Sequence, residues 1–290
     1  MDLEYISWQW SHPCFDIWEE IEGVHFYTMF VQRSALINGA SFANLMNDTG
    51  AAIWYQSQAD LISSRLEEFW DPIDLIVKTT MNISENGRPT KISNLDVSVL
   101  LAILHCDAAN SSYSIHNDKI LSTLSKLERI MYELYPINQN LTITLIGRYP
   151  EDIYDGVGLS SGNPWVLATH AFAEHSFLLA DYYFTQKSIN ITKISLPFFV
   201  NLIKDPPISI EDQGIVLEEG SKLFKFIVGN LTMRGDLILE TLYTLVGNGS
   251  YPEQINKETG ALQGARNLSW SESSFITAIR AKPKLMLSGL

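Results

Sequence analysis

A helical repeat of apolar side chains is the feature of this sequence that most constrains its fold. Between residues 118 and 135 the chain reads DKILSTLSKLERIMYELY, and its apolar positions fall on one stripe: Ile120, Leu124, Leu127, Met131 and Leu134. This spacing predicts an amphipathic helix whose apolar face packs against a core. Asn117 or Asp118 is suited to cap the helix, and Pro136 should end it.

Helical patterns occupy most of the remaining sequence. Asn163 and Pro164 suit the N-cap and first position of a helix that runs to about Phe184. Ser269 and Glu272 have the spacing of a capping box. We therefore expect helices at residues 25–47, which are apolar on several faces, and at 50–70, 95–106, 163–184, 196–204, 214–229, 233–247 and 269–282.

The sequence contains little evidence of β-structure. Leu141–Ile146 is the best candidate strand, and it is short. Leu3, Ile6 and Trp10 repeat at helical spacing without a capping residue before them, so the chain is expected to begin within a helix. No low-complexity linker interrupts residues 1–290. These observations predict one all-α domain of successive antiparallel helices.

Charge and cysteine content narrow the possible partners. The formal net charge of −13 argues against nucleic acid or an anionic membrane, because both require a basic face. No apolar run is long enough to span a bilayer. The absence of CxxC and HExxH patterns gives no indication of a metal site. Cys14 and Cys106 could form one disulfide, and the sequence leaves that open.

Glycosylation sequons suggest the secretory pathway, in the vacuole or outside the cell. Asn-x-Ser/Thr occurs eight times, at Asn47, Asn82, Asn110, Asn140, Asn190, Asn230, Asn248 and Asn267. The acidic opening Met1-Asp2-Leu3-Glu4 does not have the pattern of a signal peptide. We therefore expect this chain to lack its natural beginning.

Three acidic loops carry the side chains best suited to chemistry. The first contains FDIWEEIEG at residues 15–23. The second reads GRYPEDIYDGVGLSSGNPW at residues 147–165. The third reads YPEQINKETG at residues 251–260 and is followed by ARNLSW at residues 265–270. Loops between helices are where a helical scaffold presents functional groups.

The first loop has the composition that a general acid needs. Hydrolysis of a glycosidic bond by inversion uses one carboxylic acid to protonate the leaving oxygen and a carboxylate about 6.5–9.5 Å away to activate water. Trp18, Asp16 and Glu20 could keep the Glu19 carboxyl protonated through burial and neighbouring negative charge. A solvated helix end is the alternative interpretation.

The second loop offers a polar pair. Arg148 and Asp152 could bind sugar hydroxyls, because a guanidinium group presents its donors in a fork. A salt bridge that only fixes the loop is the alternative. The aromatic content of 11% is compatible with stacking on sugars and with filling a core.

Together, the three loops resemble the motifs of fungal glucoamylases, glycoside hydrolase family fifteen. DIWEEIEGVHFYT, GRYPEDIYDG with GNPW, and PEQINKETG with ARNLSWS stand in the family order. The resemblance covers essentially the whole chain and is closest to the yeast enzymes that have no separate starch-binding domain. It implies an (α/α)₆ barrel, formed by a single catalytic domain at residues 1–290 that lacks the family's first helices.

The resemblance also implies a function. The family's enzymes are glucan 1,4-alpha-glucosidases that release β-D-glucose, with inversion, from the non-reducing ends of starch, glycogen and maltodextrins. They need no metal or organic cofactor, and we expect a monomer acting on α-1,4-glucan. Glu19 matches the general acid and Glu253 the general base. The positions that match substrate-binding residues are Asp16, Trp18, Glu20, Arg148, Asp152, Trp165 and Trp270.

Two other interpretations stay open. The absent first helices are compatible with a truncated, catalytically inactive fragment. A glucan-binding homologue without activity is the second alternative, although binding alone would not require both Glu19 and Glu253. Gly264 stands where many relatives have a serine that is hydrogen-bonded to the base, which puts the pH profile in doubt.

Overall fold

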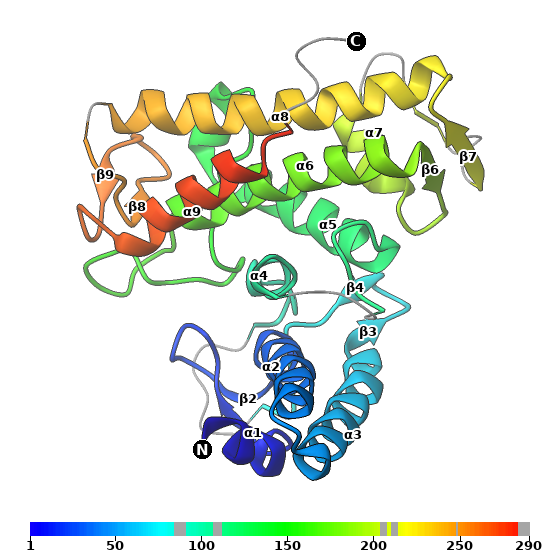
Figure 1. The fold of residues 1–290 in the computed structure, drawn as a ribbon. Helices are drawn as coiled ribbons and strands as arrows, with labels where there is room; N and C mark the ends of the chain where they lie inside the picture. Colours follow the sequence, from blue (N-terminus) through cyan, green and yellow to red (C-terminus); the bar gives the residue numbers. More distant parts are fainter. Residues whose placement is uncertain (84–90, 107–111, 204–207, 210–213, 248, 284–290) are drawn as a thin grey trace. The chain divides into compact units, whose positions relative to one another are not determined.

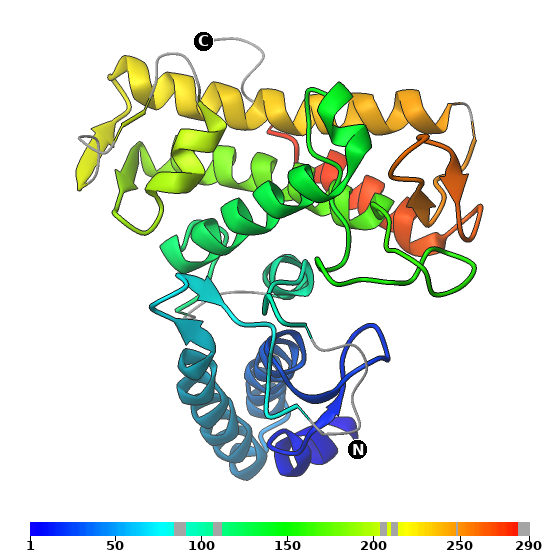
Figure 2. The same ribbon diagram turned by 180° about the vertical axis from the view of Figure 1, so that it is seen from behind.

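The computed structural model describes residues 1–83, 91–106, 112–203, 208–209, 214–247 and 249–283. The chain divides into two compact units, Met1–Ile120 and Leu121–Leu290. Figures 1 and 2 show that helices dominate both units.

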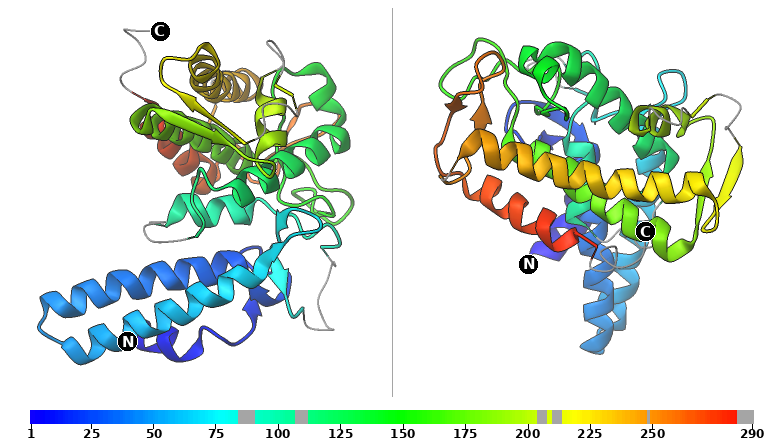
Figure 3. Two further views of the ribbon diagram at one scale, coloured as in Figure 1. Left: turned by 90° about the vertical axis from the view of Figure 1, so that its right-hand side faces the viewer. Right: turned by 90° about the horizontal axis from the view of Figure 1, so that it is seen from above.

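Two long antiparallel helices form most of the first unit. α2 packs along α3, and α1 and α4 pack on α2; Figure 3 shows α2 and α3 side by side. Phe26, at the start of α2, lies in an aromatic core with ring centroids 5.6 Å from those of Phe30 and Phe69 and 5.1 Å from that of Tyr113. The helices of this unit are α1 (Asp2–Gln9), α2 (Phe26–Leu45), α3 (Thr49–Leu66), the 3₁₀ helix η1 (Glu67–Phe69) and α4 (Ser98–His105).

Short strands tie the ends of these helices together. β2 lies between β1 and β5 in a three-stranded antiparallel sheet, and β3 pairs with β4. The strands are β1 (Cys14–Phe15), β2 (Glu22–His25), β3 (Trp70–Asp71), β4 (Ile76–Val77) and β5 (Thr80–Met81).

The second unit is organised around α6, which packs on α8 and α9. α6 is buried on most of its faces, as expected for a helix with apolar residues on several faces. A core of buried residues that includes Leu179, Phe198 and Ile227 joins α6 to α7 and α8. The elements are α5 (Asp118–Leu134), η2 (Pro136–Asn140), α6 (Val166–Gln186), β6 (Ser188–Ile191), α7 (Leu196–Leu202), β7 (Ile215–Glu218), α8 (Lys222–Val246), β8 (Gln254–Ile255), β9 (Leu262–Gln263) and α9 (Ser269–Ala281).

Most of the predicted helices are present within one to four residues of their predicted ends, but the region after residue 213 differs. The predicted helices 214–229 and 233–247 are helical over most of their length, but they are one helix, α8, at Lys222–Val246. The predicted start at 214 is wrong, because Ile215–Glu218 forms β7, which pairs with β6. Asn230 does not interrupt α8, because its Nδ2 donates to the carbonyl of Phe226 at 2.8 Å within the same helix.

One predicted helix cap is confirmed, because Asn117 Oδ1 accepts from Lys119 N at 3.0 Å at the start of α5. The other two predicted caps are wrong. α6 begins at Val166 without a side-chain cap. Asn163 instead donates from Nδ2 to Gln254 Oε1 at 3.0 Å, which ties two loops together. Glu272 Oε1 accepts from the backbone of Tyr251 at 2.7 Å, so it does not complete a capping box with Ser269. Long-range partners outcompete local capping at both positions.

The candidate strand Leu141–Ile146 is irregular. Side chains satisfy its backbone: Leu145 donates to Asn138 Oδ1 at 2.9 Å, and Ile146 donates to Thr169 Oγ1 at 3.0 Å. With those donors paired to side chains, this segment needs no neighbouring strand.

Most of the glycosylation sequons lie on the surface, as expected for sites that carry glycans. Of the sequon asparagines that the structure describes, Asn230 is half-buried and the others are exposed: Asn47, Asn82, Asn140, Asn190 and Asn267. Asn110 and Asn248 lie outside the described residues. Cys14 and Cys106 are free thiols. No helix among the described residues has the length and apolar character needed to cross a membrane.

Candidate active site

Glu19 lies in the loop of a β-hairpin, so the alternative interpretation of this segment as a helix end is wrong. β1 and β2 pair antiparallel, and residues 16–21 connect them. Asp16 N donates to Ile21 O at 2.9 Å, and Glu19 N donates to Asp16 O at 3.0 Å, so the loop is closed by its own backbone. Glu19 is exposed and has a φ of 59°, in the left-handed region that disfavours side chains with a Cβ. The expected burial of the Glu19 carboxyl against Trp18 is therefore wrong: the residue is exposed, and the Trp18 indole bonds to Asp96 instead.

Asp16 is buried beneath this loop. Its Oδ1 accepts from the backbone N–H groups of Glu20 at 2.9 Å and Ile21 at 3.3 Å. Its Oδ2 lies 2.8 Å from Lys91 Nζ. Burial alone would raise the pKa of Asp16, but the charge and hydrogen bond of Lys91 and the two backbone donors lower it below its usual value. Asp16 thus organises the loop; the prediction that it also binds substrate is untested.

The residues on both sides of Glu19 are anchored. The Trp18 indole Nε1 donates to Asp96 Oδ2 at 3.0 Å, and the half-buried Glu20 is fixed by its backbone bond to Asp16. Asp96 is fully buried and also accepts from Ser98 N at 2.7 Å. Glu19 is therefore flanked by two residues that hydrogen bonds fix in place.

Sequence reasoning missed Lys91 and Asp96. One signal could have drawn attention to Asp96: it is the only charged residue between Lys91 and His105, in a segment that is otherwise mostly apolar. A lone charge in a helix-forming apolar segment needs a buried partner. Nothing in the sequence identifies that partner as Lys91.

In the second unit, Arg148 and Asp152 form a buried two-point pair. Arg148 Nε lies 2.8 Å from Asp152 Oδ2, and Arg148 Nη2 lies 2.6 Å from Asp152 Oδ1. The Arg148 guanidinium carbon lies 5.1 Å from the ring centroid of Trp165 and 5.5 Å from that of Tyr154. The internal salt bridge is thus present, and it holds the guanidinium between aromatic rings.

Glu253 lies beside this group with a side chain that is largely buried. The residue is 9% exposed. Its backbone N–H donates to Ala265 O at 2.8 Å, and Ala265 N donates back to Glu253 Oε2 at 3.0 Å. The Tyr154 hydroxyl also bonds to Glu253; burial first, and the Glu253 charge second, raise the pKa of Tyr154, so this hydroxyl stays protonated and donates. The Glu253 carboxylate is held by a backbone donor and a phenol.

Gly264 permits this arrangement. It has a φ of 72°, and a Cβ at this position would collide with Glu253 Oε2. No serine side chain could occupy this position without displacing the carboxylate. Tyr154, which sequence reasoning did not single out, supplies a hydroxyl to Glu253 instead.

The two predicted tryptophans lie on elements joined to the Glu253 loop. Val166 N, directly after Trp165, donates to Glu253 O at 3.1 Å. Trp270 is half-buried in the first turn of α9, and the neighbouring Ser271 donates to Pro252 O at 2.8 Å. The second unit thus gathers four of the predicted site residues directly around one loop, Arg148, Asp152, Trp165 and Glu253, with Trp270 on the adjoining helix.

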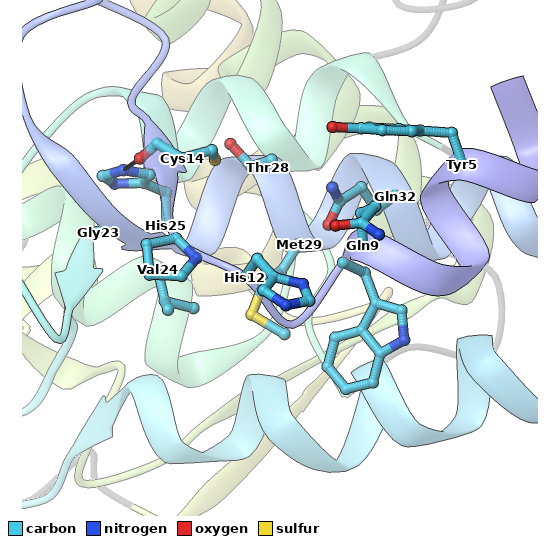
Figure 4. A pocket seen from close by; sticks show the side chains of 12 residues that line it. Tyr5, Gln9, His12, Cys14, Gly23, Val24, His25, Thr28, Met29 and Gln32 are labelled. Atoms are coloured by element: carbon cyan, nitrogen blue, oxygen red, sulfur yellow. Dashed lines mark hydrogen bonds between the residues drawn. The ribbon is translucent and has the colours of Figure 1, made fainter.

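Two cavities among the described residues lie away from Glu19 and Glu253. The first unit has one of about 100 Å³ between α1, the hairpin and α2, lined by Tyr5, Gln9, Cys14 and Gln32 among others. Figure 4 shows His25 bonded to the Cys14 carbonyl at its edge. The second unit has a hollow of about 730 Å³ against α5, α7 and α8. Neither is lined by a predicted catalytic residue. Glu19 lies in the first unit and Glu253 in the second, so their pairing stays a prediction.

The chain matches one protein family along nearly its whole length. Residues 1–280 match the family described as "Glycosyl hydrolases family 15". The chain belongs to glycosyl hydrolase family 15. This result confirms the resemblance seen in the three loop motifs.

Individual relatives agree with the family match. The chain is 36% identical over 285 residues to "Glucoamylase 1" of Rhizopus oryzae, covering 97% of this chain and 46% of that protein. It is 34% identical to "Probable glucoamylase" of Schizosaccharomyces pombe, covering 96% of this chain and 56% of that protein. The chain thus spans about half the length of these curated relatives.

Solved structures of the family share the fold. A glucoamylase from Saccharomycopsis fibuligera is similar at a TM-score of 0.87 and 29% identity, covering 97% of this chain and 59% of that chain. A family 15 glucoamylase from Hypocrea jecorina gives 0.85 and 30%, covering 97% and 45%. The all-α class predicted from the sequence is confirmed, and it is the class of the family's (α/α)₆ barrels.

Proposed function

We propose that this family 15 chain is the catalytic part of an exo-acting, inverting α-glucosidase that releases β-D-glucose from the non-reducing ends of α-1,4-glucans. One observation supports the proposal: Glu253, the predicted base, shares Tyr154 with the Arg148–Asp152 pair, and its carbonyl accepts from the residue after Trp165. A base needs this kind of fixed environment to aim a water molecule.

The roles follow from the chemistry of inversion. Glu19 donates a proton to the leaving glycosidic oxygen from its exposed loop. Glu253 removes a proton from the attacking water on the opposite face of the sugar. The sugar site is formed by Arg148, Asp152, Trp18, Trp165 and Trp270. Asp16 and Glu20 bind the sugar or organise this site. The reaction needs no cofactor. We further propose a monomer of the secretory pathway whose partner is glucan, and neither nucleic acid nor membrane.

The test is glucose release from maltotriose by the purified chain, with proton NMR to identify the first anomer formed. Release of β-glucose is expected. Glu19→Gln and Glu253→Gln should each lower kcat by about 10²–10⁴-fold, the range for loss of general acid–base catalysis. Glu258→Gln is the matched control, because Glu258 is an exposed acid five positions along the chain, in the turn between β8 and β9.

Three results would contradict the proposal. Full turnover by either Gln variant would remove that residue from the mechanism. Release of α-glucose would exclude inversion. Binding of maltotriose without hydrolysis would instead favour a glucan-binding homologue.

A further inference from the structure

A cluster of buried charges lies under the hairpin that carries Glu19. Lys91 Nζ is 2.8 Å from Asp16 Oδ2 and 2.5 Å from Asp96 Oδ2. The side chains of Lys91, Asp16 and Asp96 are 1%, 4% and 0% exposed. Taking three charged groups out of water carries a large desolvation cost, so each must be closely partnered.

The cluster satisfies this requirement with donors from the hairpin itself. Two carboxylates and one ammonium leave one excess negative charge. Asp16 accepts from the backbone of Glu20, and Asp96 accepts from the Trp18 indole. His25, which packs nearby, adds no cation, because burial lowers its pKa and keeps it neutral. Among the residues that the structure describes, Lys91 is the cation that pairs with both carboxylates.

The connectivity has a specific consequence for Glu19. Trp18 is tied to the cluster through Asp96, and Glu20 is tied to it through Asp16. Glu19 lies between them, exposed and in the left-handed region of backbone space. Both immediate neighbours of the proposed acid are thus linked through one ammonium group.

We infer that Lys91 is a positioning residue for the general acid: by bridging Asp16 and Asp96 it fixes the two ends of the Trp18–Glu20 segment and so sets where the Glu19 carboxyl points. This inference rests on the proposed function. A purely structural salt bridge would stabilise the first unit without affecting the direction of Glu19.

The first test replaces Lys91 by Met, which keeps the aliphatic length and removes the charge. Lys119→Met is the matched control: Lys119 forms an ion pair of the same 2.8 Å length with Glu67 in the same unit, but that pair is partly exposed. We measure kcat and KM on maltotriose, together with the NMR signal of the Trp18 indole N–H, assigned with Trp18→Phe.

Lys91→Met should lower kcat on the order of 10- to 100-fold, because a misplacement of about 1 Å can cost this much, and should leave KM within about twofold. The Trp18 indole signal should move, since its acceptor Asp96 loses a partner. Lys119→Met should change neither quantity. A folded Lys91→Met chain with unchanged kcat, or with an unmoved Trp18 signal, would overturn the inference.

A second variant covers loss of folding in Lys91→Met. Asp96→Asn preserves the side-chain volume and one oxygen acceptor, and it removes one of the two negative charges that pair with Lys91. It should also shift the Trp18 signal and lower kcat, and failure to do either would overturn the inference. Failure of the proposed function is distinguishable: Glu19→Gln would then retain activity, whereas the Trp18 signal would still report on the cluster.

Discussion

The two loops that carry the proposed acid and base are held by different kinds of interaction. The hairpin loop of Glu19 is closed by its own backbone, but buried charged side chains, chiefly Lys91, anchor it to the rest of the first unit. The loop of Glu253 is anchored by backbone hydrogen bonds, including those with Ala265 and Val166. Glu19 is exposed, whereas Glu253 is 9% exposed.

This contrast indicates which changes each loop should tolerate. A loop held by buried charges should respond to substitutions and pH values that alter charge. A loop held by backbone contacts at close approach should respond to added atoms and to altered backbone freedom. The difference also suits the two proposed roles, since an acid that protonates a leaving group must reach it, while a base must hold water in a fixed place.

The largest effect is expected from Gly264→Ala in the second unit. The added Cβ collides with Glu253 Oε2, and the φ of 72° is unfavourable for alanine. We expect a loss of about 2–5 kcal/mol in the free energy of unfolding, from overpacking and backbone strain together. Chemical denaturation of the purified chain measures it, and kcat should also fall because the carboxylate is displaced.

Gly214→Ala is the control that separates the two causes. Gly214 has a similar φ of 76°, but a Cβ there would meet nothing within 4 Å. We expect the free energy of unfolding to fall by about 1–2 kcal/mol, from backbone strain alone. Equal losses for the two variants would show that the Glu253 side chain moves aside freely and is not held in place.

A smaller effect is expected from acid, and it should be confined to the hairpin. The pKa of Asp16 is lowered in the folded chain, so its stabilising contribution is present above the unfolded aspartate pKa of about 3.9 and is lost as pH falls through the lower folded value. The net effect is limited because burial opposes the attraction to Lys91. The Trp18 indole signal, followed from pH 6 downwards, should shift in this acid range.

The alkaline side provides the comparison. Attraction to Asp96 and Asp16 outweighs desolvation and raises the pKa of Lys91, so its contribution is present below the unfolded lysine pKa of about 10.4 and is lost only above it. The Trp18 signal should therefore be constant between pH 6 and 9. A shift inside that interval would mean that another group controls the hairpin.

The sequence was informative where structure is periodic or local. The stripe on α5 and the apolar faces of α2 predicted helices because side-chain spacing alone decides them. The three loop motifs were identifiable because their residues are contiguous. Strands of two residues, such as β1 and β8, are too short to show alternation, so the segment of Glu19 was predicted only as a loop between helices and its hairpin was missed.

Long-range partners were the part that the sequence could not provide. Lys91 is 75 positions from Asp16, and no pattern in a single sequence pairs the two. Asn163 had the chemistry of an N-cap, yet it bonds to Gln254, 91 positions away. Such pairings depend on how the helices pack. Apolar periodicity predicts which face of a helix is buried, but it does not predict which residues contact each other there.

The smallest effect is expected from Glu19→Gly, and it separates catalysis from stability. Glycine accepts the φ of 59° without the cost of about 1–2 kcal/mol that other residues bear, but it loses roughly 0.5–1 kcal/mol of chain entropy. The net change in the free energy of unfolding should be a gain of about 0.5 kcal/mol, while kcat falls by about 10²–10⁴-fold as in Glu19→Gln. Glu19→Gln should show the same fall in kcat without this gain in stability, because glutamine keeps the Cβ. If Glu19→Gly were instead clearly destabilised, the Glu19 side chain would itself stabilise the hairpin. The view that Lys91, Asp16 and Asp96 hold the hairpin without help from Glu19 would then be wrong.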